Sequence, residues 1–260
     1  MRHPPRPPGP RVVSGRLCTL PAMRARFVLI AILAAASAAS AASSGAAAGA
    51  APATHAAHAA QAASTLTVIH CPTRFGIKQK VVWPRSVLVA RTPSSTRGLV
   101  AYSNSQLVLI GPAGMSCSGV VAADGGESIA AWPPGHVMPR QHAHYDGLTL
   151  WLDPACAGCR AADACPFFTA LASALGFPCT SGVPAGEQLA RLSPHVTLFE
   201  DPPGVAGSGW PSGGPNPANG VVGVAGSLTS GIVYRSTCTL AAAQHQACTI
   251  SLNDVIARYG

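Results

Sequence analysis

Cysteine placement limits the folds open to this 260-residue chain more than any other feature. Cys18 lies upstream of a segment with the features of a secretion signal, and eight cysteines lie downstream of it. Disulfides persist in oxidising compartments, where an even number of cysteines is expected. The sequence therefore predicts four disulfides in the mature chain. Their candidate residues are Cys71, Cys117, Cys156, Cys159, Cys165, Cys179, Cys238 and Cys248.

Residues 1–41 have the features of a leader that contains a signal peptide. A short basic segment begins at Met23, the apolar run 27–33 follows it, and the small residues 36–41 suit signal peptidase. The apolar run is well short of the ~20 residues of a membrane helix, which favours cleavage over anchoring. We expect Met23 to be the true start; the alternative is that residues 1–22 form a cytoplasmic extension.

The positive charge of the chain belongs mostly to this leader. Six of the 17 basic residues are leader arginines, which leaves 11 basic against nine acidic residues and a net charge of +2 in place of +8. No later segment combines basic runs with aromatic residues. The mature chain therefore lacks the basic patch that nucleic-acid binding requires. No later segment is apolar enough to span a membrane either.

Residues 42–64 are rich in alanine and contain almost no large apolar side chain, which is typical of a disordered tether. Residues 65–260 are numerous enough to build one domain with a core. Strands are expected where short apolar or β-branched runs are bounded by Gly, Pro, Asn and Ser. These runs are 66–70, 86–90, 98–102, 106–110, 120–123, 128–132, 148–152, 196–199 and 220–224.

Two segments read as helices. Residues 166–175 start with a proline and end before Gly176, and residues 244–259 carry an apolar stripe that ends at Gly260. The turn Asp124–Glu127 favours a hairpin. Together these elements predict an α+β fold: a single disulfide-stabilised domain, mostly antiparallel sheet, with two or three helices including a C-terminal one.

A long connection dense in glycine and proline runs from Asp201 to Gly220. Loops of this length are often functional, and its prolines, together with Trp210 as an anchor, favour an ordered course over the surface. We take four residues as binding candidates. They are Asp201, Trp210, Asn216 and Asn219. The alternative is a packed Ω-loop that binds nothing.

Several segments together resemble a group of secreted, cysteine-rich actinobacterial proteins. They are 71–76, 116–118, 201–204, 215–220, 236–240 and 248–260, so the resemblance spans nearly the whole mature region. The high content of Ala, Gly and Pro also fits a GC-rich actinobacterial genome. The resemblance implies export and a cysteine-rich domain, and it brings no activity or catalytic residue with it.

The CxxC sequence Cys156–Cys159 leaves three interpretations open. A redox pair is expected at a helix N-terminus, where the thiol pKa is lowered, yet no thioredoxin-like pattern surrounds this one. A zinc site would need Cys165 and Cys179 as further ligands at irregular spacing. Export favours structural disulfides over both. Two pairs are proposed, Cys71–Cys117 and Cys238–Cys248, with the other four cysteines pairing among themselves.

Two further patterns suggest chemistry. His142, His144 and Asp146 would share one face of a strand and could bind Zn²⁺ or Fe²⁺. They resemble the HxHxDH motif of metallo-β-lactamase-fold hydrolases, but Gly147 replaces the last histidine. Ser116 lies in a sequence similar to a nucleophile elbow, but Gly-x-Ser-x-Gly fails at its final position and strand-like residues follow.

We therefore expect an exported extracellular or cell-envelope protein, more typical of a binding or structural module than of an enzyme. The partner would be extracellular or part of the envelope, and no cofactor is expected. The alternative is a secreted hydrolase that uses His142, His144 and Asp146 or Ser116.

Overall fold

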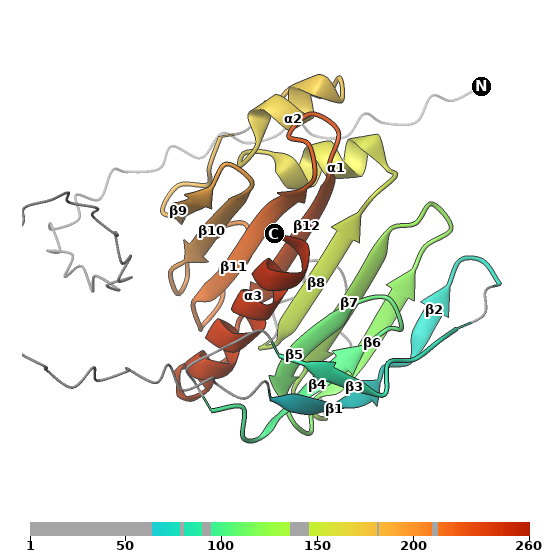
Figure 1. The fold of residues 1–260 in the computed structure, drawn as a ribbon. Helices are drawn as coiled ribbons and strands as arrows, with labels where there is room; N and C mark the ends of the chain where they lie inside the picture. Colours follow the sequence, from blue (N-terminus) through green and yellow to red (C-terminus); the bar gives the residue numbers. More distant parts are fainter. Residues whose placement is uncertain (1–63, 79–80, 90–94, 136–145, 181, 210–212) are drawn as a thin grey trace, which may run out of the picture. The chain divides into compact units, whose positions relative to one another are not determined.

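The computed structural model describes residues 64–78, 81–89, 95–135, 146–180, 182–209 and 213–260. In that part of the chain, twelve strands form two sheets, accompanied by three α-helices (Figure 1). The strands are β1 Thr65–His70, β2 Thr73–Phe75, β3 Ser86–Leu88, β4 Leu99–Ser103, β5 Val108–Pro112, β6 Ser116–Val121, β7 Glu127–Trp132, β8 Leu148–Asp153, β9 Gln188–Ser193, β10 Val196–Asp201, β11 Ala218–Ala225 and β12 Ile232–Cys238. The helices are α1 Ala157–Ala164, α2 Thr169–Ala174 and α3 His245–Tyr259, the last preceded by a 3-10 turn, Ala242–Gln244.

The larger sheet has eight strands in the order β2-β6-β7-β8-β12-β11-β10-β9. Neighbouring strands in this sheet are antiparallel, except that β2 and β6 are parallel. Along β11, successive side chains point to opposite faces of this sheet. Val221 packs with the core that includes α3, and Val222 packs with the core that includes α1 and α2. The two faces therefore carry separate hydrophobic cores.

The smaller sheet has four strands in the order β3-β1-β4-β5 and packs on the same side as α3. Ile250 of α3 packs among the residues of this sheet, beside Ile110. Asn104 fastens the two sheets to each other. Its Oδ1 accepts the Leu107 N–H at 2.7 Å, and its Nδ2 donates to the Ser128 carbonyl of β7 at 2.9 Å. The buried amide satisfies backbone groups of both sheets at one point.

Eight cysteines form four disulfides, as their parity predicted. The two pairs proposed from the sequence, Cys71–Cys117 and Cys238–Cys248, are both confirmed. The first joins the residue after β1 to β6, and the second joins the end of β12 to α3. The remaining four cysteines pair among themselves, as Cys156–Cys159 and Cys165–Cys179.

The mixed α+β class, the predominance of sheet and the C-terminal helix are confirmed. The sheet is divided in two, however, and the small sheet contains a parallel pair, β1 with β4, which the sequence did not indicate. The helix expected over 166–175 begins later, at Thr169, and the helix α1 before it was not anticipated.

Three strands, β2, β9 and β12, were also not anticipated. Every residue of β9 but the last is exposed, so the strand shows no alternation of buried and exposed side chains, and its sequence, Gln-Leu-Ala-Arg-Leu-Ser, does not alternate strictly between polar and apolar residues. Residues 1–63, which include the expected leader and the alanine-rich segment up to its last residue, lie outside the described residues. Within the described part of the chain, no helix combines the length and the apolar character needed to cross a bilayer.

Candidate functional site

The proposed metal ligands are only partly placed. His142 and His144 lie outside the described residues, whereas Asp146 lies just before β8. Its Oδ1 accepts a hydrogen bond from Nδ2 of Asn216 at 2.6 Å. Asp146 thus contacts the glycine- and proline-rich connection. Among the residues that the structure describes, no three His, Cys, Asp or Glu side chains gather as a metal site would require.

Ser116 is the first residue of β6, and a strand follows it rather than a helix. His195 lies in the turn between β9 and β10, with Nδ1 3.2 Å from the Val224 carbonyl oxygen. Strand β10 is five steps from β6 in the sheet. At about 4.8 Å a step, the strands are roughly 24 Å apart. A serine hydrolase that uses Ser116 would need a histidine base, and His195, which Asp153 or Asp201 could assist in such a triad, is therefore too far away to be that base.

The connection between β10 and β11, residues 201–217, folds back on itself in the parts that are described. The Gly204 N–H donates to the Gly214 carbonyl at 2.7 Å, so the two halves of the loop contact each other. The Gly209 N–H donates to Oδ2 of Asp201 at 2.6 Å. An ordered course was predicted, and these bonds show it for 201–209 and 213–217. Trp210 lies outside the described residues.

Two carboxylates accept hydrogen bonds from backbone N–H groups of this loop. Asp201 is fully buried at the end of β10, and Glu187 lies just before β9, where Oε2 accepts the Ser208 N–H at 2.7 Å. Burial raises the pKa of the Glu187 carboxyl, the hydrogen bonds from Ser208 oppose that rise, and the adjacent Asp201 adds to it. Backbone N–H groups of the loop therefore supply part of the hydrogen bonding that these two acids need.

Asn219 lies elsewhere. It is the second residue of β11, in register with Glu200 and Cys238. Because it alternates with Ala218 and shares the parity of Val221, it is on the face of the sheet that α3 covers. Asp201 pairs with Ala218 and is therefore on the other face. Of the four binding candidates, the structure groups Asp201 and Asn216 with the loop and separates Asn219 from it.

Arg235 is the centre of a charged cluster under α1. Its guanidinium lies 3.7 Å from an Asp163 carboxylate oxygen and 5.6 Å from the centre of the Phe199 ring. Burial lowers the pKa of Arg235, and the charges of Asp163, Glu187 and Asp201 act against that change. This Arg235 cluster (Arg235, Asp163, Glu187, Asp201) connects helix α1 with the base of the loop.

A second carboxyl pair adjoins this cluster. Asp153, the last residue of β8, hydrogen-bonds with Asp163 of α1. Burial raises the pKa of Asp153 to about 7, with further rises from the hydrogen bond and charge of Asp163 and from the charge of Asp124, while Arg160 opposes them. Such a pair holds a proton near neutral pH.

Helix α1 begins with the CxxC disulfide. Cys156 is the N-cap residue, and its Sγ accepts a hydrogen bond from the Cys159 N–H at 3.1 Å. No helix was expected here from the sequence, so a redox role had little support at that point. In the structure the CxxC lies at a helix N-terminus, which is the setting in which thiols acquire a low pKa. The four cysteines considered for zinc are instead bonded in pairs.

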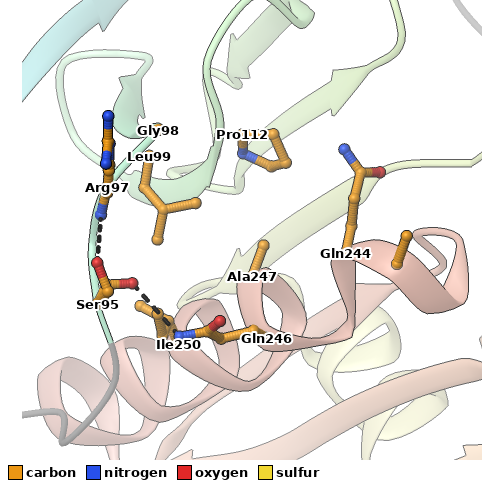
Figure 2. Close-up of a pocket in the computed structure, with 10 residues that line it drawn as sticks. Ser95, Arg97, Gly98, Leu99, Pro112, Gln244, Gln246, Ala247 and Ile250 are labelled. Carbon is orange, nitrogen blue, oxygen red and sulfur yellow. Dashed lines mark hydrogen bonds between the residues drawn. The ribbon is translucent and has the colours of Figure 1, made fainter.

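A pocket of about 210 Å³ lies between the start of α3 and the segment before β4 (Figure 2). It is smaller than the ~300–1,000 Å³ of most organic-ligand sites. Its polar atoms already bond to one another: the Arg97 N–H donates to Ser95 Oγ at 3.2 Å, and Gln246 Nε2 lies 3.5 Å from the Ser95 carbonyl. The pocket therefore offers little to a ligand.

The charged residues at Arg235 and Asp153 were not identified from the sequence, because they come from separate segments. A prediction of α1 would have placed one of these residues beside the CxxC. Asp163 follows Cys159 by four residues, so the two side chains lie on the same side of a helix. Comparisons with protein-family models, with curated proteins and with solved structures found no match.

Proposed function

We propose that this chain is an exported binding module of the extracellular space or cell envelope, and that the loop 201–217 is its contact surface. Four disulfides fit an oxidising compartment. The observation that carries the proposal is the anchoring of the loop. Asp201 and Glu187 hold it at the neighbouring residues Gly209 and Ser208, and Asp146 holds it at Asn216.

An anchored loop suits recognition for an entropic reason. Residues fixed before binding lose less conformational freedom when the partner arrives. Pro203, Gly204, Ala206 and Pro215 of the loop are exposed, while Asp201 beneath them is fully buried. The loop thus presents a fixed outer surface of small and rigid residues.

The test is co-sedimentation of the purified, exported chain with isolated actinobacterial cell walls. Removing residues 203–216 is a poor variant, because it takes Ser208 and Gly209 away from the two carboxylates. Gly209→Val is sharper. A Cβ at Gly209 would lie 2.6 Å from the Ala218 Cβ, so the loop must move off the sheet while the cores stay intact.

Gly182→Ala is the matched control, since no atom lies within 4 Å of its Cβ position. We expect wild type and Gly182→Ala to sediment with the walls and Gly209→Val to lose at least about tenfold in affinity, roughly 1.4 kcal/mol. Circular dichroism verifies that all three are folded. Equal sedimentation of all three variants would show that the loop is not the contact surface, and a wild type left in the supernatant would refute wall binding.

A further inference from the structure

Accessibility distinguishes the Cys156–Cys159 disulfide from the others. Cys71, Cys238 and Cys248 are buried, Cys117, Cys165 and Cys179 are partly buried, and Cys159 is the one exposed cysteine in the described part of the chain. A thiolate must reach a sulfur atom before it can exchange with a disulfide. The bond at the start of α1 is therefore the one most open to attack.

Cys156 Sγ, the other sulfur of this bond, is a better leaving group than Cys159 Sγ. Cys156 caps α1, its Sγ accepts the Cys159 N–H, and the positive end of the helix dipole faces it. Each of these favours a thiolate at Cys156 over a thiol. Attack at the exposed Cys159 would therefore displace a stabilised thiolate, and a low-pKa leaving thiol speeds exchange.

We propose that Cys156 and Cys159 form a thiol–disulfide exchange centre that accepts electrons from cysteine pairs of other exported proteins. A substrate thiolate attacks Cys159 Sγ, the Cys156–Cys159 bond breaks, and its electron pair stays on Cys156 as a thiolate. The second substrate thiolate then attacks its own partner sulfur in the mixed disulfide and releases Cys159. The substrate is oxidised by two electrons and the CxxC is reduced by two.

Two protons leave the substrate thiols in this sequence, and the structure holds proton acceptors close to the helix start. Asp163 lies one helical turn after Cys159 and hydrogen-bonds with Asp153, which ends β8 three residues before Cys156. The pKa of Asp153 near 7 lets this pair take up or release a proton at neutral pH. Charged groups that face Asp153 are Asp163 and Arg160 of α1 and Asp124 of the β6–β7 turn.

We expect this bond to contribute least of the four disulfides to the stability of the fold. Cys156–Cys159 closes the shortest loop of the four disulfides, with a separation of 3 residues against 46 for Cys71–Cys117. Short loops restrict the unfolded chain least. Helix α1 is held by its buried residues Ala161 and Ala164, and Cys165–Cys179 fixes the chain just after it. Reduction of the CxxC should therefore leave the domain folded.

The first test is a redox titration of the folded, exported chain in glutathione buffers, followed by alkylation and tryptic mass mapping. Residues 141–160 form one tryptic peptide with both CxxC cysteines, and residues 161–191 form another with Cys165 and Cys179. We expect the first peptide to become doubly alkylated at a ratio of reduced to oxidised glutathione at least tenfold below that of the second. Joint reduction, or earlier reduction of Cys165–Cys179, would overturn the proposal.

The second test follows oxidation of a reduced dithiol peptide by the chain at equal concentration. Cys159→Ser should slow it at least a hundredfold and leave wall binding unchanged, which separates the two activities, whereas Gly182→Ala should leave the oxidation unchanged. Asp153→Asn removes a negative charge near the thiols and should shift the midpoint of their ultraviolet thiolate titration to lower pH. Wild-type oxidation no faster than Cys159→Ser would refute an exchange centre, and an unmoved midpoint would remove Asp153 from it.

Discussion

Replacing Asp153 with asparagine should stabilise the protein at pH 8 and have little effect at pH 4. In the folded state the pKa of Asp153 is raised to about 7 from the usual 3.8, so the folded chain prefers the protonated form. A raised pKa contributes stability that is present below the unfolded pKa and is lost as pH rises through the folded one. Above pH 7, the wild type therefore carries an unfavourable carboxylate at this position.

The magnitude follows from the shift of about three pKa units. At 1.36 kcal/mol per unit the full linkage would be roughly 4 kcal/mol. Asp153 is partly exposed, and solvent screening reduces this to about 2 kcal/mol. An amide at position 153 removes the charge and can still donate a hydrogen bond to the Asp163 carboxylate. We therefore expect Asp153→Asn to gain about 2 kcal/mol at pH 8 and less than about 0.5 kcal/mol at pH 4.

Urea denaturation of the oxidised protein at the two pH values measures this directly. Glu200→Gln is the control, because Glu200 is exposed on β10 and should change stability by less than about 0.5 kcal/mol at either pH. A loss of stability for Asp153→Asn that is equal at pH 8 and pH 4 would refute the carboxyl pair as described.

Three further perturbations test the fold and the Arg235 cluster. Gly220→Ala places a Cβ in the Phe199 ring and should cost about 1–3 kcal/mol in thermal unfolding, whereas Gly182→Ala should cost almost nothing. Replacing both Cys71 and Cys117 by alanine should lower the free energy of unfolding in urea by about 4 kcal/mol, and replacing both Cys238 and Cys248 should lower it by about 2.7 kcal/mol. The difference arises because the separations of the two pairs are 46 and 10 residues. The reverse order would show that native-state strain outweighs chain entropy. Arg235→Met leaves Asp163 without its cation and should destabilise the protein by about 3 kcal/mol at pH 8 and by less at pH 4, where acids take up protons; equal losses at the two pH values would contradict an electrostatic role.

Much of the fold could be predicted because its signals are local. Strands such as β1 and β8 are short apolar runs between turn residues, and the hairpin of β6 and β7 surrounds Asp124 and Gly125 in a turn. Two of the disulfides were also accessible, since the end of β12 and the start of α3 are close in sequence, and Cys71 follows the first strand.

The parts that were missed lack such signals. Helix α1 buries only alanines, Ala161 and Ala164, so it shows no stripe of large apolar residues. Strand β12 carries Arg235 and the buried Ser236 among its β-branched residues, and these polar side chains hide its alternation. Each polar residue is accommodated by partners from distant segments, such as Asp163 and the Thr149 carbonyl, which no local pattern reveals.

The candidate site shows the same division. Asp201 and Asn216 could be chosen because they begin and end a loop dense in glycine and proline. The register of β11 places Asn219 on the face of the sheet opposite to Asp201. A shift of one residue would reverse that face, and the sequence alone does not define the strand boundaries well enough to exclude such a shift. Glu187 joins the site through the pairing of β9 with β10, and Asp163 joins it through the packing of α1 on β12, so neither could be predicted.

The cysteine pairing underlies the fold, the proposed oxidising compartment and the proposed exchange centre, and a non-reducing peptide map of the chain purified without reductant tests it most directly. We expect four linkages, Cys71–Cys117, Cys156–Cys159, Cys165–Cys179 and Cys238–Cys248, with no alkylated cysteine in the mature protein before reduction. Any other pairing, or free thiols at positions other than 156 and 159, would contradict this account.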